Sequence, residues 1–282
     1  MKFLVKLTSP VAVTIEELVR ENWQLGKKTV HSLRMQKAFQ TPEGIALDWN
    51  TPLEVGQAFQ IKFEEEGSSY FPSPKIPVQP FYEDDHFMIV GKPAGIKTHP
   101  NEVTETQTLM NGVFHYLDGK GHGYGEHVHR LDEGTSGLVL IAKHPIAKNL
   151  LDKMLEKKQI VRTYEAIVEG SVKNNQGTIK TAIASDRHHP NRRRVSQTGQ
   201  TAITHYQVVG RNPQITKLHI LLETGRTHQI RVHMAHIGHP IVGDTLYGAR
   251  AITAQHYALQ AFRIQFRHPI TGELVNVEIP RT

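Results

Sequence analysis

The sequence of 282 residues is long enough for one large domain with a small appendage, or for two modest domains. Its lack of cysteine excludes disulfide bonds, thiolate metal sites and cysteine nucleophiles. The net charge of +6 favours a polyanionic partner. No apolar run is long enough to cross a bilayer and no signal-peptide core follows the first residues, so we expect a cytoplasmic protein that does not contact membranes. We also expect it to be a monomer.

The N-terminal third predicts a small module followed by a linker. In TIEELVR (14–20), Thr14 and Glu17 have the spacing of a helix capping box. A second helix is expected at about 27–38, and its basic face is either solvated or a nucleic-acid contact. The segment at 54–63 alternates like a strand. Four prolines in FPSPKIPVQP (71–80) then indicate a stiff connector. We therefore expect domains at 1–70 and 81–282, joined by the linker 71–80.

The main domain predicts a mixture of strands and helices without βαβ regularity. Strand patterns occur at 87–90, 137–142, 206–209, 262–267 and 275–279, and helix patterns at 106–117, 145–157 and 227–237. Consecutive alternating strands favour an α+β fold with a central, mostly antiparallel or mixed sheet and peripheral helices.

Asp132 is the first candidate for chemistry. It follows His127, His129 and Arg130 and precedes a turn of small residues in HRLDEGTSGL (129–138). The cationic neighbours would keep the carboxylate ionised, as a nucleophile or base requires. The alternative is a turn aspartate that caps local amides, which spacing alone favours.

Two arginines stand near the start of the helix predicted at 227–237. Arg226 and Arg231 each carry a permanent charge and a planar fork of donors. Such a group fits either phosphate oxygens or a buried carboxylate.

Four histidines in the same region raise the possibility of a metal site: His228, His233, His236 and His239. The sequence lacks HExxH, and no acidic residue occurs between Glu223 and Asp244. We therefore expect ordinary hydrogen-bonded histidines and no metal.

Two basic loops and one tyrosine complete the candidates. The segment RHHPNRRRV (187–195) predicts a turn-rich loop that either follows a phosphate backbone or is merely solvated. The segment GKPAGIKTHP (91–100) is a loop after a strand and lacks the order of a phosphate-binding P-loop. Tyr164 begins a strand, where a tyrosine is more often part of the core.

These segments together resemble the RluA-type family of RNA pseudouridine synthases. The matching segments are GKPAGIKTHP (91–100), HRLDEGTSGL (129–138), RTYEA (162–166), GRTHQIRVH (225–233) and GHPIVGDTLYG (238–248). They occur in the family's order and cover the chain from about residue 85 onward. The first 70 residues resemble a divergent S4-type RNA-binding module, in which TPEG (41–44) replaces the usual turn.

The resemblance implies an RNA-binding cleft and the conversion of uridine to pseudouridine without cofactor or metal. It assigns Asp132 as the catalytic aspartate, Tyr164 as the active-site tyrosine and Arg231 as the partner of the aspartate. It implies that Arg130 fills the space of the flipped nucleotide. The expected substrate-binding residues are His129, Arg130, Arg226, His228 and Ile230. The expected contacts to the RNA backbone are Lys92, Arg192, Arg193 and Arg194.

The resemblance leaves the chemistry and the substrate open. Asp132 would attack C1′ of the ribose or abstract the C2′ proton. Large-subunit ribosomal RNA is the expected substrate, with transfer RNA as the alternative. Two alternative hypotheses for the function are a catalytically silent RNA-binding protein and a histidine–metal hydrolase acting on nucleic acid.

Overall fold

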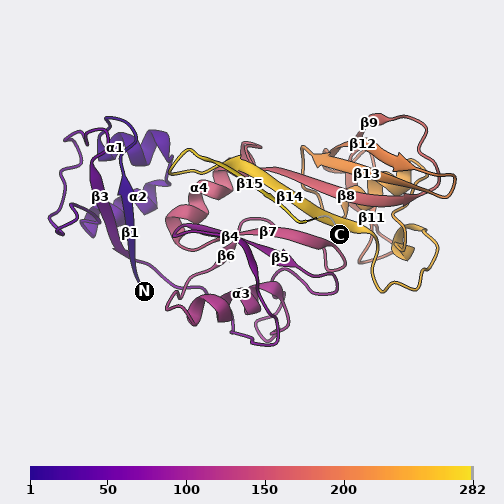
Figure 1. The fold of residues 1–282 in the computed structure, drawn as a ribbon, viewed down its shortest axis with the longest axis horizontal. Helices are drawn as coiled ribbons and strands as arrows, with labels where there is room; N and C mark the ends of the chain where they lie inside the picture. The colour runs from indigo at the N-terminus through magenta and orange to yellow at the C-terminus, as the bar shows by residue number, and fades with distance from the viewer. Residues whose placement is uncertain (281–282) are drawn as a thin grey trace.

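The computed structural model describes residues 1–280 as an elongated molecule with a small sheet at one end and a large sheet along the rest (Figure 1). The small sheet has the antiparallel order β1-β3-β2. Its elements are β1 (Lys2–Thr8), α1 (Ile15–Glu17), the π-helical turn η1 (Leu18–Asn22), α2 (Lys27–Met35), β2 (Phe39–Gln40) and β3 (Ala58–Glu64). We call this part of the chain the N-terminal module.

The local sequence explains how the N-terminal module begins and ends its helices. The predicted capping box is present: Glu17 N donates to Thr14 Oγ1 at 3.2 Å, and Thr14 N donates to Glu17 Oε2 at 3.0 Å. The second helix ends at Met35 rather than at 38, because Lys37 takes a left-handed conformation (φ +48°) and turns the chain into β2. Apolar side chains of the helices and strands form one cluster, which includes Ile15 and Ile61.

The large sheet has ten strands, and its path runs β4-β5-β7-β14-β8-β13-β12-β9, with β15 on β14 and β6 on β7. Its strands are β4 (Pro80–Glu83), β5 (Phe87–Lys92), β6 (Glu126–His127), β7 (Ser136–Ala142), β8 (Val161–Glu169), β9 (Gln176–Lys180), β12 (Ile203–Arg211), β13 (Ile215–Leu222), β14 (Leu259–Arg267) and β15 (Leu274–Glu278). A separate hairpin joins β10 (Ile183–Ser185) to β11 (Arg193–Val195). The predicted α+β fold with a mostly antiparallel sheet is confirmed.

Helices cover both faces of the large sheet. They are α3 (Leu109–Asp118), α4 (Pro145–Glu156), α5 (Gln229–His236) and the short 3-10 helix η2 (Thr245–Tyr247). Alternate residues of β5 point to opposite faces. Met88 packs in a cluster with α3 and α5, whereas Phe87 packs in a cluster with α4. Within residues 1–280, every helix is too short or too polar to span a lipid bilayer.

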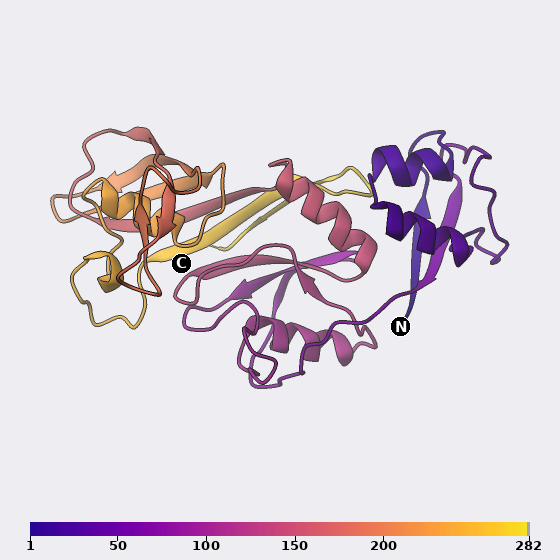
Figure 2. The same cartoon turned by 180° about the vertical axis from the view of Figure 1, so that it is seen from behind.

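Helix α4 and the linker connect the N-terminal module to the large sheet. Ile146 and Leu150 of α4 pack in the apolar cluster of the N-terminal module, and both views show this helix between the two sheets (Figures 1 and 2). The linker is held against α3, since Ser73 N donates to Asn111 O and Asn111 Nδ2 donates to Phe71 O. The domain boundaries at 70 and 80 stay predictions.

The two halves of the large sheet meet at a short parallel contact between β7 and β14. Only two residue pairs form it, and one of them joins Gly137 to Ala261. Gly137 has φ +122°, and a Cβ built on it would lie 2.2 Å from Ala261 O. This approach of two backbones therefore requires glycine at the position that follows the small-residue turn of HRLDEGTSGL.

We expect Gly137→Ala to lower the free energy of unfolding by at least about 2 kcal/mol, because the new methyl group meets backbone in a left-handed conformation. Urea unfolding measures the change. Gly210→Ala is the matched control in β12, where a Cβ has open space, and we expect a change of about 0.5 kcal/mol or less. Equal losses in the two variants would contradict this account of the junction.

Candidate active site

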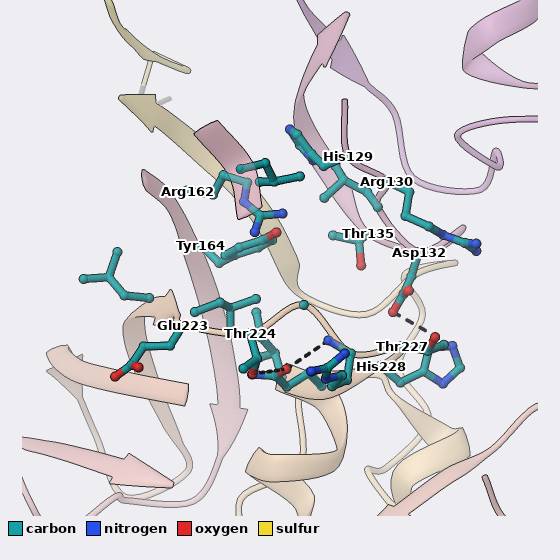
Figure 3. Close-up of a pocket in the computed structure, with 18 of the residues that line it drawn as sticks. His129, Arg130, Asp132, Thr135, Arg162, Tyr164, Glu223, Thr224, Thr227 and His228 are labelled. Atoms are coloured by element: carbon teal, nitrogen blue, oxygen red, sulfur yellow. Dashed lines mark hydrogen bonds and ion pairs between the residues drawn. The ribbon is translucent and has the colours of Figure 1, made fainter. Parts of the chain in front are cut away.

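A cleft of about 630 Å³ opens beside the junction of β7 and β14. Its lining includes the loop 129–135 before β7, the start of β8 and the segment 221–231 that leads into α5, together with Leu155, Glu156 and Lys158 at the end of α4. Figure 3 shows the side chains of these parts facing one another across the cleft. Residues far apart in the sequence thus converge because β7, β14, β8 and β13 are neighbours in the sheet.

Asp132 lies at the edge of this cleft with its side chain 20% exposed. Its own turn is closed by the backbone, since Thr135 N donates to Asp132 O at 3.0 Å. The carboxylate instead faces two basic groups: Arg231 Nη1 lies 3.5 Å from Oδ2, and His228 Nε2 lies 3.9 Å from the same oxygen. Among residues 1–280, no amide donates to this carboxylate. The side chain is therefore directed at the cleft and does not cap its turn.

Arg231 is buried, with 6% of its surface exposed. Its strongest partner is Asp244: Nε donates to Oδ2 at 2.7 Å and Nη2 donates to Oδ1 at 2.9 Å. Burial disfavours the charge, but the hydrogen bonds and charge of Asp244 outweigh it, so the pKa of Arg231 is raised. The two-pronged bond to Asp244 fixes the guanidinium plane and leaves Nη1 directed at Asp132.

Two tyrosines enclose Arg231. Its guanidinium carbon lies 4.3 Å from the ring centre of Tyr257 and 4.9 Å from that of Tyr247. Tyr257 also reaches the loop 129–135, since its hydroxyl lies 3.1 Å from Thr135 Oγ1. A Cβ on Gly134 would lie 2.7 Å from the Tyr257 ring. The ring is thus the packing contact between the loop that carries Asp132 and the helix that carries Arg231.

His228 is oriented by Tyr247. The Tyr247 hydroxyl accepts from Arg193 N at 2.9 Å and lies 2.8 Å from His228 Nδ1. The contact at Nδ1 turns the other ring nitrogen, Nε2, toward Asp132, at 3.9 Å from Oδ2. Burial is the largest effect on His228 and lowers its pKa, although Asp132 opposes this shift.

Tyr164 and Arg162 lie on the opposite wall of the cleft. Both point to the same side of β8, because residues two apart in a strand share a face, and Figure 3 shows both side chains directed into the cleft. Tyr164 is 5% exposed, and burial raises its pKa. Arg162 Nε is buried and has no hydrogen-bond partner among the described residues. The wall that carries Tyr164 therefore also holds a buried guanidinium nitrogen, Arg162 Nε, that has no carboxylate partner among the described residues.

The other expected substrate-binding residues divide between the rim and the floor. Arg130 and Arg226 are exposed at the rim, and Arg226 Nε donates to Thr201 O at 3.1 Å. Ile230 is buried in the core and lines the cleft. His129 is buried, and its Nε2 accepts from Leu140 N, so this ring fastens the loop to β7. Their contacts with substrate stay predictions.

The basic loop lies near Tyr247, beside the cleft. Arg192 and Arg194 are exposed. The Arg192 guanidinium carbon lies 5.7 Å from the ring centre of Tyr247, and Arg193 Nη1 donates to Ser185 Oγ at 2.7 Å. This hairpin therefore approaches the cleft from the side of α5, and its contact with an RNA backbone stays a prediction.

The expectation for Lys92 is wrong. Lys92 is 2% exposed, and its ammonium group donates to the carbonyl oxygens of Pro93, Ile96 and Glu133. Burial lowers its pKa to about 8, against the opposing charges of Asp132 and Glu133. All three donors are used inside the protein. Lys92 therefore fastens the loop after β5 to the loop 129–135 and has no donor left for a phosphate.

The clustered histidines are engaged separately. His233 lies between Thr204 Oγ1 and Thr181 O, at 2.9 Å from each, and His239 Nδ1 lies 2.8 Å from Glu169 O. Within residues 1–280, no group of three or more histidine and acidic side chains is arranged to hold a metal ion.

Sequence reasoning missed Asp244, Tyr247, Tyr257 and Arg162. Asp244 and Tyr247 lie in GHPIVGDTLYG (238–248). Because a buried arginine such as Arg231 needs a carboxylate partner, Asp244, the first acidic residue after it, could have been proposed as that partner from the sequence. Arg162 lies two residues before Tyr164, and strand alternation places both on one face. Tyr257 follows the irregular segment 249–256, and nothing in its neighbourhood in the sequence indicated a role.

Comparison with known proteins identifies the family. The family model of RNA pseudouridylate synthase matches residues 86–236, more than half of the chain. The model of the RluD ribosomal pseudouridine synthase N-terminal domain matches residues 6–59. The uncharacterised RNA pseudouridine synthase YhcT of Bacillus subtilis (strain 168) is 50% identical over 202 residues, which cover 71% of this chain and 67% of that protein.

Two further comparisons agree. Ribosomal large subunit pseudouridine synthase D of Haemophilus ducreyi (strain 35000HP / ATCC 700724) is 37% identical over 243 residues, covering 80% of this chain and 74% of that protein. The structure of human RNA pseudouridylate synthase domain containing 1 matches with a TM-score of 0.61 and 24% identity, over 77% of this chain and 86% of that chain. The match to the human structure, at 24% identity, supports the fold alone.

The chain therefore belongs to the RNA pseudouridylate synthase family. It is an isomerase that forms pseudouridine in RNA, and the RluA-type resemblance and the separate N-terminal module are confirmed.

We expect Asp244→Ala to lower the free energy of unfolding by about 3–5 kcal/mol, because it leaves the buried guanidinium of Arg231 without its two hydrogen bonds. Urea unfolding followed by circular dichroism measures the loss. Asp152→Ala is the control, since Asp152 pairs with Lys148 on the exposed side of α4, and its loss is about 0.5 kcal/mol or less. A similar small loss for Asp244→Ala would show that the pair does not hold Arg231.

Proposed function

We propose that this enzyme modifies uridine in large-subunit ribosomal RNA, with Asp132 as the group that acts on the ribose. Two relationships support the substrate: relatives named as ribosomal large subunit pseudouridine synthase D, and the match of the N-terminal module to the RluD N-terminal domain. The observation that carries the site assignment is the chain of contacts from Asp244 through Arg231 to Asp132 in the cleft.

The reaction requires the target base to leave its stack in the RNA. Its N1–C1′ bond breaks, the base rotates, and C5 bonds to C1′ while the C5 proton is lost. Tyr164 would pack on the uracil face and keep the detached base in the cleft. Arg130, exposed at the rim, would occupy the position that the base has left.

Asp132 has two routes to the ribose. Its carboxylate attacks C1′ and N1 leaves with the bonding electron pair, or it takes the C2′ proton and the same leaving group departs to give a glycal. The two routes place the carboxylate on different atoms of the same sugar. Each requires the carboxylate form of Asp132.

Arg231 would act mainly by position. An arginine beside the carboxylate stabilises the anion in the ground state, which by itself reduces nucleophilicity. Because Asp244 and the two tyrosine rings fix the guanidinium, Arg231 holds Asp132 in one orientation toward the cleft. We therefore classify Arg231 as a positioning residue.

Mapping pseudouridine in total RNA tests this proposal. A deletion strain is expected to lose pseudouridine at specific positions of large-subunit ribosomal RNA. The wild-type gene and Glu133→Gln restore them, because Glu133 is an exposed neighbouring carboxylate. Asp132→Asn does not restore them, because an amide neither attacks C1′ nor accepts the C2′ proton. We expect a loss of at least about 10³-fold in tritium release from 5-³H-uridine RNA.

Binding separates a chemical defect from loss of substrate. In a gel-shift assay, Asp132→Asn is expected to bind the ribosomal RNA transcript within about twofold of the wild type, since it stays folded around the same cleft. Full turnover by Asp132→Asn would contradict the assignment of Asp132. Loss of pseudouridine from transfer RNA alone would contradict the ribosomal substrate.

A further inference from the structure

A second groove, of about 570 Å³, separates the N-terminal module from the large sheet. One wall comes from the end of η1, at Asn22–Gln24. The other comes from the C-terminal half of α4, the turn into β8, and the turn between β14 and β15. In Figure 2, α4 and the β14–β15 turn, in yellow, both extend to the N-terminal module. We call this the interdomain groove.

The described lining of the interdomain groove has basic residues and no acidic ones, although Lys158 pairs with Glu223 of the active-site cleft at 3.3 Å. Its charged lining residues are Lys153, Lys157, Lys158 and Arg267. None of the lining residues described within 1–280 is acidic. The Lys153 ammonium donates to Gln24 O and the Lys157 ammonium donates to Gln24 Oε1 at 2.9 Å. The positive charges of Lys153 and Lys157 therefore lie beside the same neutral residue, Gln24. A bound polyanion would reduce the repulsion between these two ammonium groups.

The interdomain groove is adjacent to the active-site cleft. Lys158 and Val161 line both. Lys158 stands at the boundary, in a left-handed conformation (φ +58°) at the turn between α4 and β8. On the far side, the chain leads from Gln24 to Lys27 and Lys28 at the start of α2. Both lysines are exposed, and neither forms an ion pair in the part of the chain that the structure describes.

We propose that the interdomain groove holds the sugar–phosphate backbone of the substrate RNA on one side of the target uridine, and leads that strand from the cleft to the N-terminal module. The proposal rests on the proposed function, because the cleft is where the flipped uridine leaves the strand. Phosphate groups fit the observed chemistry, since exposed ammonium and guanidinium groups along a groove follow a backbone without selecting a base. Base selection is left to the cleft.

The salt dependence of RNA binding tests the groove. We compare the wild type with Lys157→Gln/Arg267→Gln on a large-subunit ribosomal RNA transcript of the source organism. Loss of two phosphate contacts is expected to reduce the slope of log K against log salt concentration by roughly 1.5. The associated loss in kcat/KM is expected to lie in KM, because neither side chain lines the active-site cleft.

A matched control removes two lysines elsewhere. Lys75 lies in the linker beside α3, and Lys173 lies in the turn before β9. Both are exposed and outside the two grooves. Lys75→Gln/Lys173→Gln has the same change in net charge and is expected to keep the wild-type slope. Equal slopes for the two double variants would overturn the proposal. Thermal unfolding of each variant confirms that it is folded.

A directed cleavage experiment keeps the proposal testable if a double variant fails to fold. Because the sequence has no cysteine, a single cysteine carries tethered Fe–EDTA at one chosen place. Gln159→Cys, in the groove, is expected to cleave the transcript at nucleotides beside the target uridine, whereas Lys75→Cys does not. Absence of that cleavage would overturn the proposal.

These experiments distinguish failure of the groove proposal from failure of the proposed function. Should the wild type form pseudouridine while the groove variants bind naked RNA normally, the groove proposal alone fails. The same holds if those variants lose affinity only for assembled ribosomal particles, since that result would indicate a protein partner. Failure of the wild type to modify ribosomal RNA would instead overturn the proposed function.

Discussion

The charge of Arg231 is the constraint on which the active site depends, because a buried guanidinium destabilises the fold unless each of its edges is satisfied. Asp244 satisfies two of its nitrogens, and the rings of Tyr247 and Tyr257 cover its faces. The remaining nitrogen lies 3.5 Å from Asp132. The requirement to pair this cation therefore draws the loop 129–135, α5 and the segment around η2 into one arrangement.

The junction of β7 and β14 explains why these parts of the chain meet. The loop with Asp132 enters β7 in one half of the sheet, whereas α5 follows β13 in the other half. Gly137 allows the two backbones to approach, and Lys92 fastens the neighbouring loop through three carbonyl oxygens. The small residues and the lysine of the family motifs thus have structural explanations. The interdomain groove lies beyond the same cleft.

The sequence predicted what depends on local spacing. The capping box of Thr14 and Glu17, the helix beginning at Pro145 and the alternating strands follow from short-range hydrogen bonding and side-chain periodicity. Neighbouring residues made Asp132 and Arg231 candidates, the resemblance assigned them roles together with Tyr164, and the structure places all three at the cleft.

Contacts between residues far apart in the chain could not be predicted from the sequence. A lysine in a loop predicts exposure, but Lys92 is buried because Pro93, Ile96 and Glu133 offer it carbonyl oxygens in three dimensions. Asp244 and Tyr257 likewise gain their roles only when η2 and β14 fold beside α5. Spacing along the chain carries no information on such pairings, since it does not state which strands are neighbours.

The most direct test of the central claim is the coupling between Arg231 and Asp244 in catalysis. Single-turnover rates are measured for Arg231→Gln, Asp244→Asn and the double variant at saturating RNA. If Asp244 acts through Arg231, the double variant reacts at the rate of the slower single variant, because both changes release the same group. Rate losses that multiply in the double variant would contradict the account and show that Asp244 and Arg231 act on the reaction independently.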